Sequence, residues 1–351
     1  MILEACTQTG TKPEDIDYMV IAANTVMQHL ITGYSPVSMG VAPFTTTSLF
    51  GEELPAWEGL PASKNIKIYY TPAISAYVGG DITAGLLAAG FENINDPAIF
   101  LDIGTNGEIV LKHENIYYCC ATAAGPAFEG AEITMGMAAE PGAIDHVKLK
   151  NNFGIPTSET RPPQNSTQTD FEIEYSTIGD SKPKGLCGSG LLDILAVLLD
   201  IGAVDETGRL DREKFHLTPE SEANVNDSVY VTAGDIRKLQ LAKAAIAAGI
   251  QVLLHFAGIE EKDIKLLALA GGFGSYMDLN SAARIGLFPK SLLPVAKTYG
   301  NTAGEGAAQT ITDKNALSIL DKINAQCQYI ELSSIAFFND KFIDEMAFEE
   351  S

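Results

Sequence analysis

Short runs of apolar residues that end in glycine-rich turns recur along the chain and predict an α/β fold. The clearest run begins at Phe100, reaches Asp102, turns over residues 104–107 and continues through residues 108–111. A second run, residues 266–270, also ends at glycines. Short apolar runs bounded by glycine are typical of buried strands. We therefore predict a strand–turn–strand hairpin at Asp102 and a second buried strand that leads into a glycine turn.

Other segments show the spacing of apolar residues that is typical of helices. Residues 74–89 and 301–308 are rich in small residues, as two closely packed helices require. The predicted helix 233–256 follows Thr232, and Asp235 is placed to complete a capping box. The remaining predicted elements are strands at 18–22, 66–70, 144–149 and 171–176, and helices at 3–6, 26–32, 191–199 and 281–285.

We predict two lobes that divide near residue 96. Residues 1–96 are expected to form the remainder of a first lobe, and residues 97–351 a second lobe with a C-terminal return. With 351 residues, of which 46% are hydrophobic, the chain can bury two sizeable cores. Residues 151–170 are rich in proline and small polar residues, a composition that cannot bury a core. We expect a surface insertion there.

The net charge of −22 excludes two classes of partner. Nucleic acids and anionic membranes both need a basic protein surface, so we expect neither. The five cysteines show no pairing pattern, which predicts free thiols in a reducing cytoplasm. Cys119 and Cys120 are expected on opposite faces of a strand. The apolar stretches 191–204 and 241–258 are interrupted by polar residues and are predicted to be core helices, not membrane spans.

The turn of the Asp102 hairpin has the chemistry of a phosphate site. Gly104 and Gly107 let a polyphosphate approach the backbone closely, and Thr105 and Asn106 add side-chain donors. Asp102, at the end of the strand, is placed to hold Mg²⁺ through water. The alternative is an ordinary hairpin, because Asn-Gly is a common two-residue turn.

The order of these segments resembles one ATPase superfamily. A small-residue helix, the glycine hairpin, a glycine-ended strand and a second small-residue helix follow one another as in the actin, sugar-kinase and Hsp70 (ASKHA) proteins. The resemblance implies a two-lobed, ribonuclease H-like α/β fold that clamps ATP with Mg²⁺ between its lobes. It also implies that residues 102–107 form the second phosphate loop and that Gly271, Gly272 and Phe273 form the adenosine loop.

Three further candidate sites each allow two interpretations. Gln240 and Lys243 share one face of a predicted helix, so they are either adenosine contacts, as the superfamily resemblance implies, or part of a solvated face. Asp81 follows two glycines at the first small-residue helix and is either a second carboxylate for water-mediated Mg²⁺ binding beside Asp102 or a helix cap. Residues 185–190 precede a helix and are either an anion site or a packing turn.

Three longer motifs narrow the resemblance to one family. The runs at residues 122–131, 141–147 and 185–190 resemble the C-terminal ATPase domain of the reductive activators of corrinoid proteins, and the resemblance extends over about residues 15–332. It implies an ATP-dependent return of Co(II) corrinoid proteins to Co(I), feeding methyl transfer, with the corrinoid protein of a methyltransferase system as partner. The loop after the hairpin supplies the candidates to face that partner, which are Thr122, Gly125, Glu129 and Glu132.

Two features of full family members do not occur in the sequence. Residues 1–20 contain no Asp-Ile-Gly-Thr-Thr-like hairpin that would serve as a first phosphate loop, and no cysteine spacing matches a ferredoxin domain. We therefore expect an incomplete first lobe, no iron–sulfur cluster in this chain and an upstream ferredoxin-like electron-donor domain. The family resemblance is also compatible with a homodimer.

Two other functions fit the same scaffold. One is a module that docks a corrinoid protein without hydrolysing ATP. The other is a small-molecule kinase or a dehydratase activator. A kinase needs a catalytic aspartate opposite the terminal phosphate, which the sequence does not place, and a dehydratase activator needs cysteines that bridge a cluster between subunits. The motifs favour ATP-dependent reductive activation.

Overall fold

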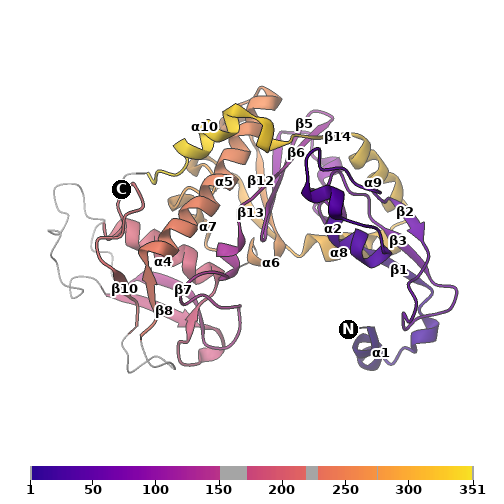
Figure 1. The fold of residues 1–351 in the computed structure, drawn as a ribbon, viewed down its shortest axis with the longest axis horizontal. Helices are drawn as coiled ribbons and strands as arrows, with labels where there is room; N and C mark the ends of the chain where they lie inside the picture. The colour runs from indigo at the N-terminus through magenta and orange to yellow at the C-terminus, as the bar shows by residue number, and fades with distance from the viewer. Residues whose placement is uncertain (1, 151–171, 219–227, 275, 350–351) are drawn as a thin grey trace.

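The computed structural model describes residues 2–150, 172–218, 228–274 and 276–349. They form an arch, with the N-terminal helices and sheet at one end, strands β7 and β8 at the other, and a six-stranded sheet between them (Figure 1). The insertion predicted at residues 151–170 lies outside the described residues.

The central sheet has the strand order β13-β12-β4-β5-β6-β14. β4, β5 and β6 form an antiparallel meander, β12 pairs with β4 and with β13 in parallel, and β14 runs parallel to β6. The predicted hairpin is confirmed as β4–β5, and the predicted second buried strand as β12. The bounds are β4 (Ala98–Ile103), β5 (Gly107–His113), β6 (Ile116–Thr122), β12 (Leu266–Ala270), β13 (Ala296–Gly300) and β14 (Cys327–Tyr329).

Both faces of the central sheet are buried, and alternate residues of each strand face different cores. Ile99 and Leu101 of β4 belong to the core that includes helices α4 (Gly188–Asp200) and α5 (Ala233–Ala257). Phe100, between them, faces the core under helix α3 (Gly80–Ala88). The adjacent thiols follow the same rule, since Cys120 belongs to the first core and Cys119 to the second. This confirms the prediction that they lie on opposite faces of a strand.

Helix α5 is the longest helix of the described residues and belongs to the larger core. The predicted capping box is confirmed, because the Thr232 hydroxyl accepts from the Asp235 N–H and the Asp235 carboxylate accepts from the Thr232 N–H at 2.9 Å. Within the described residues, α5 is the one helix long and apolar enough to cross a membrane, and 78% of its most apolar window is buried inside the protein. Its burial agrees with the predicted core helix.

The N-terminal end of the arch contains a small sheet with the order β1-β3-β2. β1 (Tyr18–Ile21) and β3 (Lys67–Tyr70) are parallel, and β2 (Glu52–Leu54) is antiparallel to β3. In the described part of residues 1–96, no strand–glycine turn–strand hairpin like the one at residues 102–107 accompanies them.

Helices α3 and α8 (Thr302–Thr312) pack directly against each other, as their small residues predict. A Cβ atom added at Gly306 would lie 2.0 Å from the Ala84 carbonyl oxygen, and one at Gly85 would lie 2.9 Å from the Thr302 hydroxyl. At Gly306 only glycine permits the close approach of the α3 backbone, and at Gly85 it leaves room for the Thr302 side chain.

The prediction of a helix over residues 74–89 is wrong in its first part, because the helix begins at Gly80. The Ser75 hydroxyl accepts from the N–H groups of Tyr77 and Val78, and the Ile74 N–H donates to the Val78 carbonyl. A serine side chain that bonds nearby backbone groups competes with helix formation. The local turn therefore replaces the first turns of the predicted helix.

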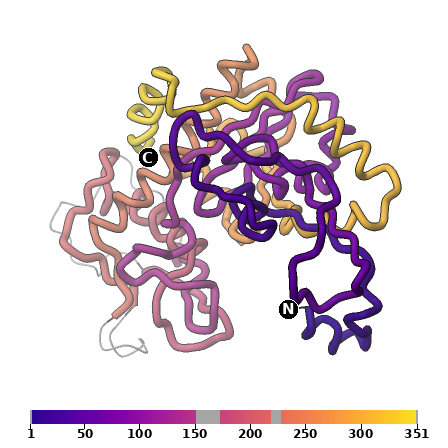
Figure 2. The backbone as a smooth tube through the Cα atoms, turned by 45° about the vertical axis from the view of Figure 1, so that its right-hand side comes forward, coloured from indigo at the N-terminus to yellow at the C-terminus, as the bar shows by residue number. Residues whose placement is uncertain are grey.

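The other elements complete the two ends of the arch. The C-terminal segment, yellow in Figure 2, returns from the end that holds the N-terminal sheet to the opposite end, where α10 packs against α5. The remaining strands are β7 (Ala143–Leu149), β8 (Ile173–Thr177), β9 (Gly185–Leu186), β10 (Lys214–His216) and β11 (Tyr230–Thr232). The remaining α-helices are α1 (Ile2–Thr9), α2 (Thr25–Thr32), α6 (Gly271–Gly274), α7 (Leu279–Arg284), α9 (Ala316–Ala325) and α10 (Ala336–Asp344).

Candidate functional site

A backbone hydrogen bond closes the turn between β4 and β5, and neighbouring side chains pack tightly against Gly107. The Gly104 N–H donates to the Asn106 carbonyl at 2.9 Å. A Cβ atom at Gly107 would lie 2.7 Å from the Thr122 hydroxyl and 2.8 Å from Ile246, so this glycine is required for packing. Gly104 has no such close neighbour. Thr105 at the tip is exposed, and the half-buried Asn106 side chain forms a hydrogen bond with Glu108.

Asp102 lies at the carboxyl end of β4, directly beside the end of β12. Ala270 is its register partner on β12, and Gly271 follows with a φ of +85°. A Cβ atom at Gly271 would lie 2.4 Å from Asp102 Oδ1, so only glycine fits against the carboxylate. The structure therefore brings the predicted phosphate turn and the predicted adenosine loop together at one sheet edge.

Three carboxylates gather on the face of the sheet that α3 covers. Asp102 and Glu108 are register partners on β4 and β5, and directly paired residues share a face of the sheet. Asp81 approaches that face from the first turn of α3. Glu108 was not among the residues predicted from the sequence, although its place opposite Asp102 in a two-strand hairpin is a signal that would have found it.

Burial raises the pKa of all three carboxyl groups, and repulsion by neighbouring carboxylates raises the pKa of Asp102 and Glu108 further. Burial raises the pKa of Asp81 to about 6, and burial together with repulsion by Asp81 raises that of Asp102 to about 6. Burial, with repulsion by Asp81 and Asp102, raises the pKa of Glu108 to about 8. Such a cluster is stabilised either by protons or by a cation that neutralises the carboxylates.

These carboxylates fit a hard cation that is held through water. Mg²⁺ prefers oxygen ligands and usually keeps several waters while it binds one or two carboxylates and phosphate oxygens. Among the described residues, no three His, Cys, Asp or Glu side chains stand close enough to enclose a metal ion directly.

The loop after β6 reaches back to the hairpin through Glu129. The Thr105 hydroxyl donates to Glu129 Oε2 at 2.9 Å, and both side chains are exposed. Of the residues predicted to face a partner, Glu129, Glu132 and Gly125 lie at or near the surface of this loop. Thr122 does not, because it is buried under the hairpin and donates to the Gly107 carbonyl at 3.2 Å.

The predicted adenosine loop is a short helix, α6, rather than an open turn. Phe273 stacks on Phe128 with ring centroids 5.4 Å apart, and Gly272 has open space where a side chain would be. Gly188, at the start of α4, packs against the ring of Phe273 and the carbonyl of Phe128. A Cβ atom added at Gly188 would lie 1.9 Å from the Phe128 carbonyl oxygen. This close packing favours the interpretation of residues 185–190 as a packing turn.

Gln240 and Lys243 are buried, and the C-terminal segment covers them. Gln240 Nε2 donates to the carbonyls of Thr207 and Met346, and Lys243 Nζ donates to the Ala347 carbonyl at 2.7 Å. Burial lowers the pKa of Lys243 to about 8. The pair is therefore not a solvated helix face, and a nucleotide would reach it only if the C-terminal segment moved.

The fold defines a class of protein, the proteins with an ASKHA domain. Within that class, residues 96–351 match the family model described as the C-terminal domain of RACo, the ASKHA domain, and residues 1–94 match the model of the RACo middle region. The chain belongs to the RACo family, the family of the reductive activators of corrinoid proteins.

Individual relatives agree with this assignment. The corrinoid activation enzyme RamQ of Eubacterium limosum is 30% identical over 376 aligned residues, which cover 100% of this chain and 59% of the relative. A reductase of the Co(II) methylated amine-specific corrinoid protein of Methanosarcina barkeri is 27% identical, over 90% of this chain and 56% of that protein. A solved structure of a reductive activator for a corrinoid, iron–sulfur protein has a TM-score of 0.85 and 33% identity, and covers 99% of this chain and 55% of that one. The chain thus spans less than two thirds of the length of each.

Proposed function

We propose that this chain binds MgATP at the meeting point of the β4–β5 hairpin and the loop after β12. The observation that carries the proposal is the contact between Asp102 and Gly271, which joins a phosphate-type turn to a glycine loop at one sheet edge. Gly104, Thr105 and Asn106 would contact the phosphates, and the backbone of Gly272 is open to a ligand. Bound Mg²⁺ would neutralise phosphate charge, held through water by Asp102 and Asp81.

We further propose that nucleotide binding drives reductive activation of a corrinoid protein in the cytoplasm. The named relatives are a corrinoid activation enzyme, a Co(II) corrinoid protein reductase and a reductive activator, which supports Co(II)-to-Co(I) reduction as the reaction. ATP would favour one arrangement of the two ends of the arch about the α3–α8 contact, and its loss would release it. The electron would come from a ferredoxin-like domain.

The experiment is ATP-dependent formation of Co(I). The purified chain is mixed with a Co(II) corrinoid protein of a methyltransferase system and a chemical reductant, and the Co(I) absorbance is followed with and without MgATP. The proposal predicts Co(I) only when chain and MgATP are both present. MgATP binding without any Co(I) would contradict the reductive role and favour a module that only docks the corrinoid protein.

A further inference from the structure

Helix α2 and the loop that follows it carry exposed apolar side chains on a surface without charged residues, at the N-terminal end of the arch (Figure 1). Residues 18–51 contain no Asp, Glu, Lys or Arg, although these residue types make up 19% of the chain. No other run without them is as long in this chain, whose net charge is −22. Four large apolar side chains of the run are more than half exposed, and we call them the α2 surface: Met27, Leu30, Val37 and Val41.

Helix α2 reverses the usual distribution of polar and apolar side chains. Thr25, Gln28 and His29 are buried, whereas Met27 and Leu30 are 56% and 62% exposed. A surface helix normally turns its apolar side chains inward and its polar side chains to solvent. Exposed apolar side chains that gather in one place mark an interaction surface. The outward face of α2 therefore has the character of a contact with another molecule.

Contacts beneath the loop after α2 hold it in place. His29 joins the helix to this loop, because its Nε2 accepts from the N–H groups of Thr47 at 3.2 Å and Ser48 at 3.4 Å. Earlier in the loop, the Tyr77 hydroxyl donates to the Met39 carbonyl at 2.7 Å. The exposure of the apolar side chains is therefore a fixed feature of the fold.

The start of α2 touches the first turn of α3, which carries Asp81. The Asp81 N–H donates to the Ala23 carbonyl at 3.3 Å, and a Cβ atom at Gly79 would lie 2.6 Å from the Asn24 Cα atom. Asn24 caps α2, since its side chain accepts from the Val26 N–H. A movement of Asp81 on nucleotide binding would therefore shift the start of α2. Direct contacts thus connect the α2 surface with the proposed nucleotide site.

The absence of carboxylates from this surface suits a corrinoid. The corrin ring is a monoanion, so a Co(II) corrin carries one positive charge and a Co(I) corrin carries none. A carboxylate beside the ring would favour the cationic Co(II) form and oppose its reduction. An uncharged apolar surface that excludes water from the ring disfavours the cation instead, because burial penalises the charged form.

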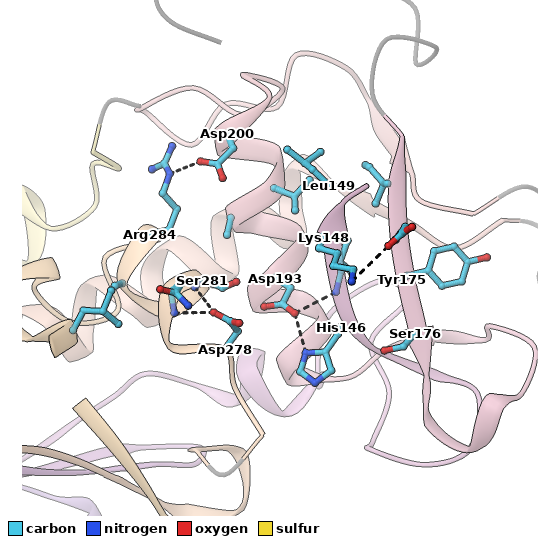
Figure 3. Close-up of a pocket in the computed structure, with 18 of the residues that line it drawn as sticks. His146, Lys148, Leu149, Tyr175, Ser176, Asp193, Asp200, Asp278, Ser281 and Arg284 are labelled. Atoms are coloured by element: carbon cyan, nitrogen blue, oxygen red, sulfur yellow. Dashed lines mark hydrogen bonds and ion pairs between the residues drawn. The ribbon is translucent and has the colours of Figure 1, made fainter. Parts of the chain in front are cut away.

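The large cavity between the β7–β8 hairpin and helices α4 and α7 has the opposite character (Figure 3). Its volume is about 1180 Å³, and Asp193, Asp200 and Asp278 are among the residues that line it. The Lys148 amino group pairs there with the Glu174 carboxylate at 3.6 Å. A corrin ring against these carboxylates would be held in its Co(II) form. The α2 surface is therefore the better match to a corrinoid.

We infer that the α2 surface docks the face of the corrinoid protein that exposes the corrin ring, and that its uncharged side chains exclude water from the ring while Co(II) is reduced to Co(I). The inference rests on the proposed function and adds the surface that contacts the partner. One electron passes from a one-electron reductant, which is oxidised, to the cobalt. No bond to this chain forms or breaks.

The first test measures, by calorimetry, how the chain with MgATP binds a Co(II) corrinoid protein of a methyltransferase system. Leu30→Glu and Val41→Glu should each raise the Kd about tenfold or more, because a charge is buried in the apolar centre of an interface. Ile343→Glu is the matched control, since Ile343 on α10 is 63% exposed, and it should bind as the wild type does. All three variants should bind MgATP like the wild type.

The second test separates charge from contact. Leu30→Gln and Leu30→Glu have side chains of similar size, and only the second is charged. With a chemical reductant, and at concentrations that saturate binding, Leu30→Gln should form as much Co(I) as the wild type, and Leu30→Glu several-fold less. Equal Co(I) formation by the two variants would show that charge on this surface does not act on the cobalt and would contradict the inference.

The remaining outcomes distinguish this inference from the proposed function. If the wild type, Leu30→Glu and Val41→Glu bind the corrinoid protein equally, the inference is wrong while the proposed function stands. If size-exclusion chromatography shows that Leu30→Glu turns a wild-type dimer into a monomer, the surface joins two copies of this chain and the inference is wrong. If the wild type binds no corrinoid protein, both fail. Circular dichroism should show every variant folded, because the substituted side chains are exposed.

Discussion

The Thr105 hydroxyl donates its one proton to the Glu129 carboxylate, 2.9 Å away. A hydroxyl has a single donor, so a phosphate oxygen that binds Thr105 in the same way must displace Glu129. The loop that carries Glu129 is fixed at its other end, where the Thr134 N–H and hydroxyl both donate to Asp235 Oδ1. Phosphate binding at the turn would therefore free one end of this loop and leave the other attached to α5.

Glu129→Gln should raise the affinity for MgATP. The substitution removes a negative charge next to the turn that binds the phosphates, and we expect a few-fold decrease in Kd at low salt that shrinks as salt increases. Calorimetry at two ionic strengths measures both effects. Glu132→Gln is the matched control, since it removes the same charge from the same loop at a carboxylate that has no contact with the turn. An unchanged Kd in Glu129→Gln would show that the carboxylate does not compete with the phosphates.

Glu108→Gln should make the protein more stable than the wild type, and the difference should grow as pH rises. The native state keeps the Glu108 proton up to about pH 8, against a usual pKa of 4.5. Between these values the native state binds more protons than the unfolded chain, so the free energy of unfolding falls as pH rises. Glutamine carries no ionisable proton, so the free energy of unfolding of the variant does not fall in this way. Its melting temperature should therefore exceed that of the wild type by an amount that grows from pH 5 to pH 8.

A control variant and the pH dependence of the difference test the prediction for Glu108→Gln. The exposed carboxylate variant Glu140→Gln should show no such trend in thermal unfolding. A constant difference between Glu108→Gln and the wild type across the pH range would show that Glu108 ionises normally and that the carboxylates do not interact as described. Added Mg²⁺ with nucleotide should reduce the difference, because the cation favours the ionised carboxylates.

Gly306→Ala should destabilise the contact between α3 and α8. The added methyl group would stand 2.0 Å from the Ala84 carbonyl oxygen, which belongs to a helix backbone and cannot move alone. We expect a loss of about 1–3 kcal/mol or more in urea unfolding, the range for overpacked sites. Gly234→Ala, in the first turn of α5 with its nearest neighbour at 3.6 Å, should be neutral or stabilising, as alanine favours helices. Equal effects of the two substitutions would contradict the close helix contact.

Lys243→Met should lower stability and leave the Kd for MgATP unchanged. Its amino group holds the Ala347 carbonyl and lies 5.0 Å from the ring centroid of the buried Phe348. Removing the donor breaks a part-buried hydrogen bond, which costs about 0.5–1.5 kcal/mol. Urea unfolding and calorimetry measure the two quantities. Weaker MgATP binding at unchanged stability would instead support the adenosine contact that the superfamily resemblance implies.

The elements that carry a strong local signal could be predicted from the sequence. The β4–β5 hairpin, β12 and the capped start of α5 follow from apolar runs, glycine turns and the Thr232–Asp235 pair. The close contact of α3 with α8 follows from their small residues. Each of these signals lies within a few adjacent residues, so local patterns are sufficient.

The relationships between distant segments could not be predicted in this way. Lys243 is covered by residues about a hundred positions later, and its helix pattern gives no sign of them. His146 has no cluster of ligands near it in the sequence, and its partner Asp193 lies on another element. Thr122 reads as an accessible loop residue, yet the register of β5 and β6 places it under Gly107. Sheet register and tertiary packing decide these positions.

The most direct test of the account is calorimetric titration of the chain with MgATP, with Asp102→Ala and Asp340→Ala as variants. Asp340 is an exposed carboxylate on α10, far along the chain from the hairpin, and serves as the matched control. We predict that MgATP binds the wild type and Asp340→Ala with micromolar affinity and does not bind Asp102→Ala. Circular dichroism should show that Asp102→Ala is folded. Equal binding by all three proteins, or no binding by the wild type, would contradict the assignment of the nucleotide site to Asp102 and its hairpin.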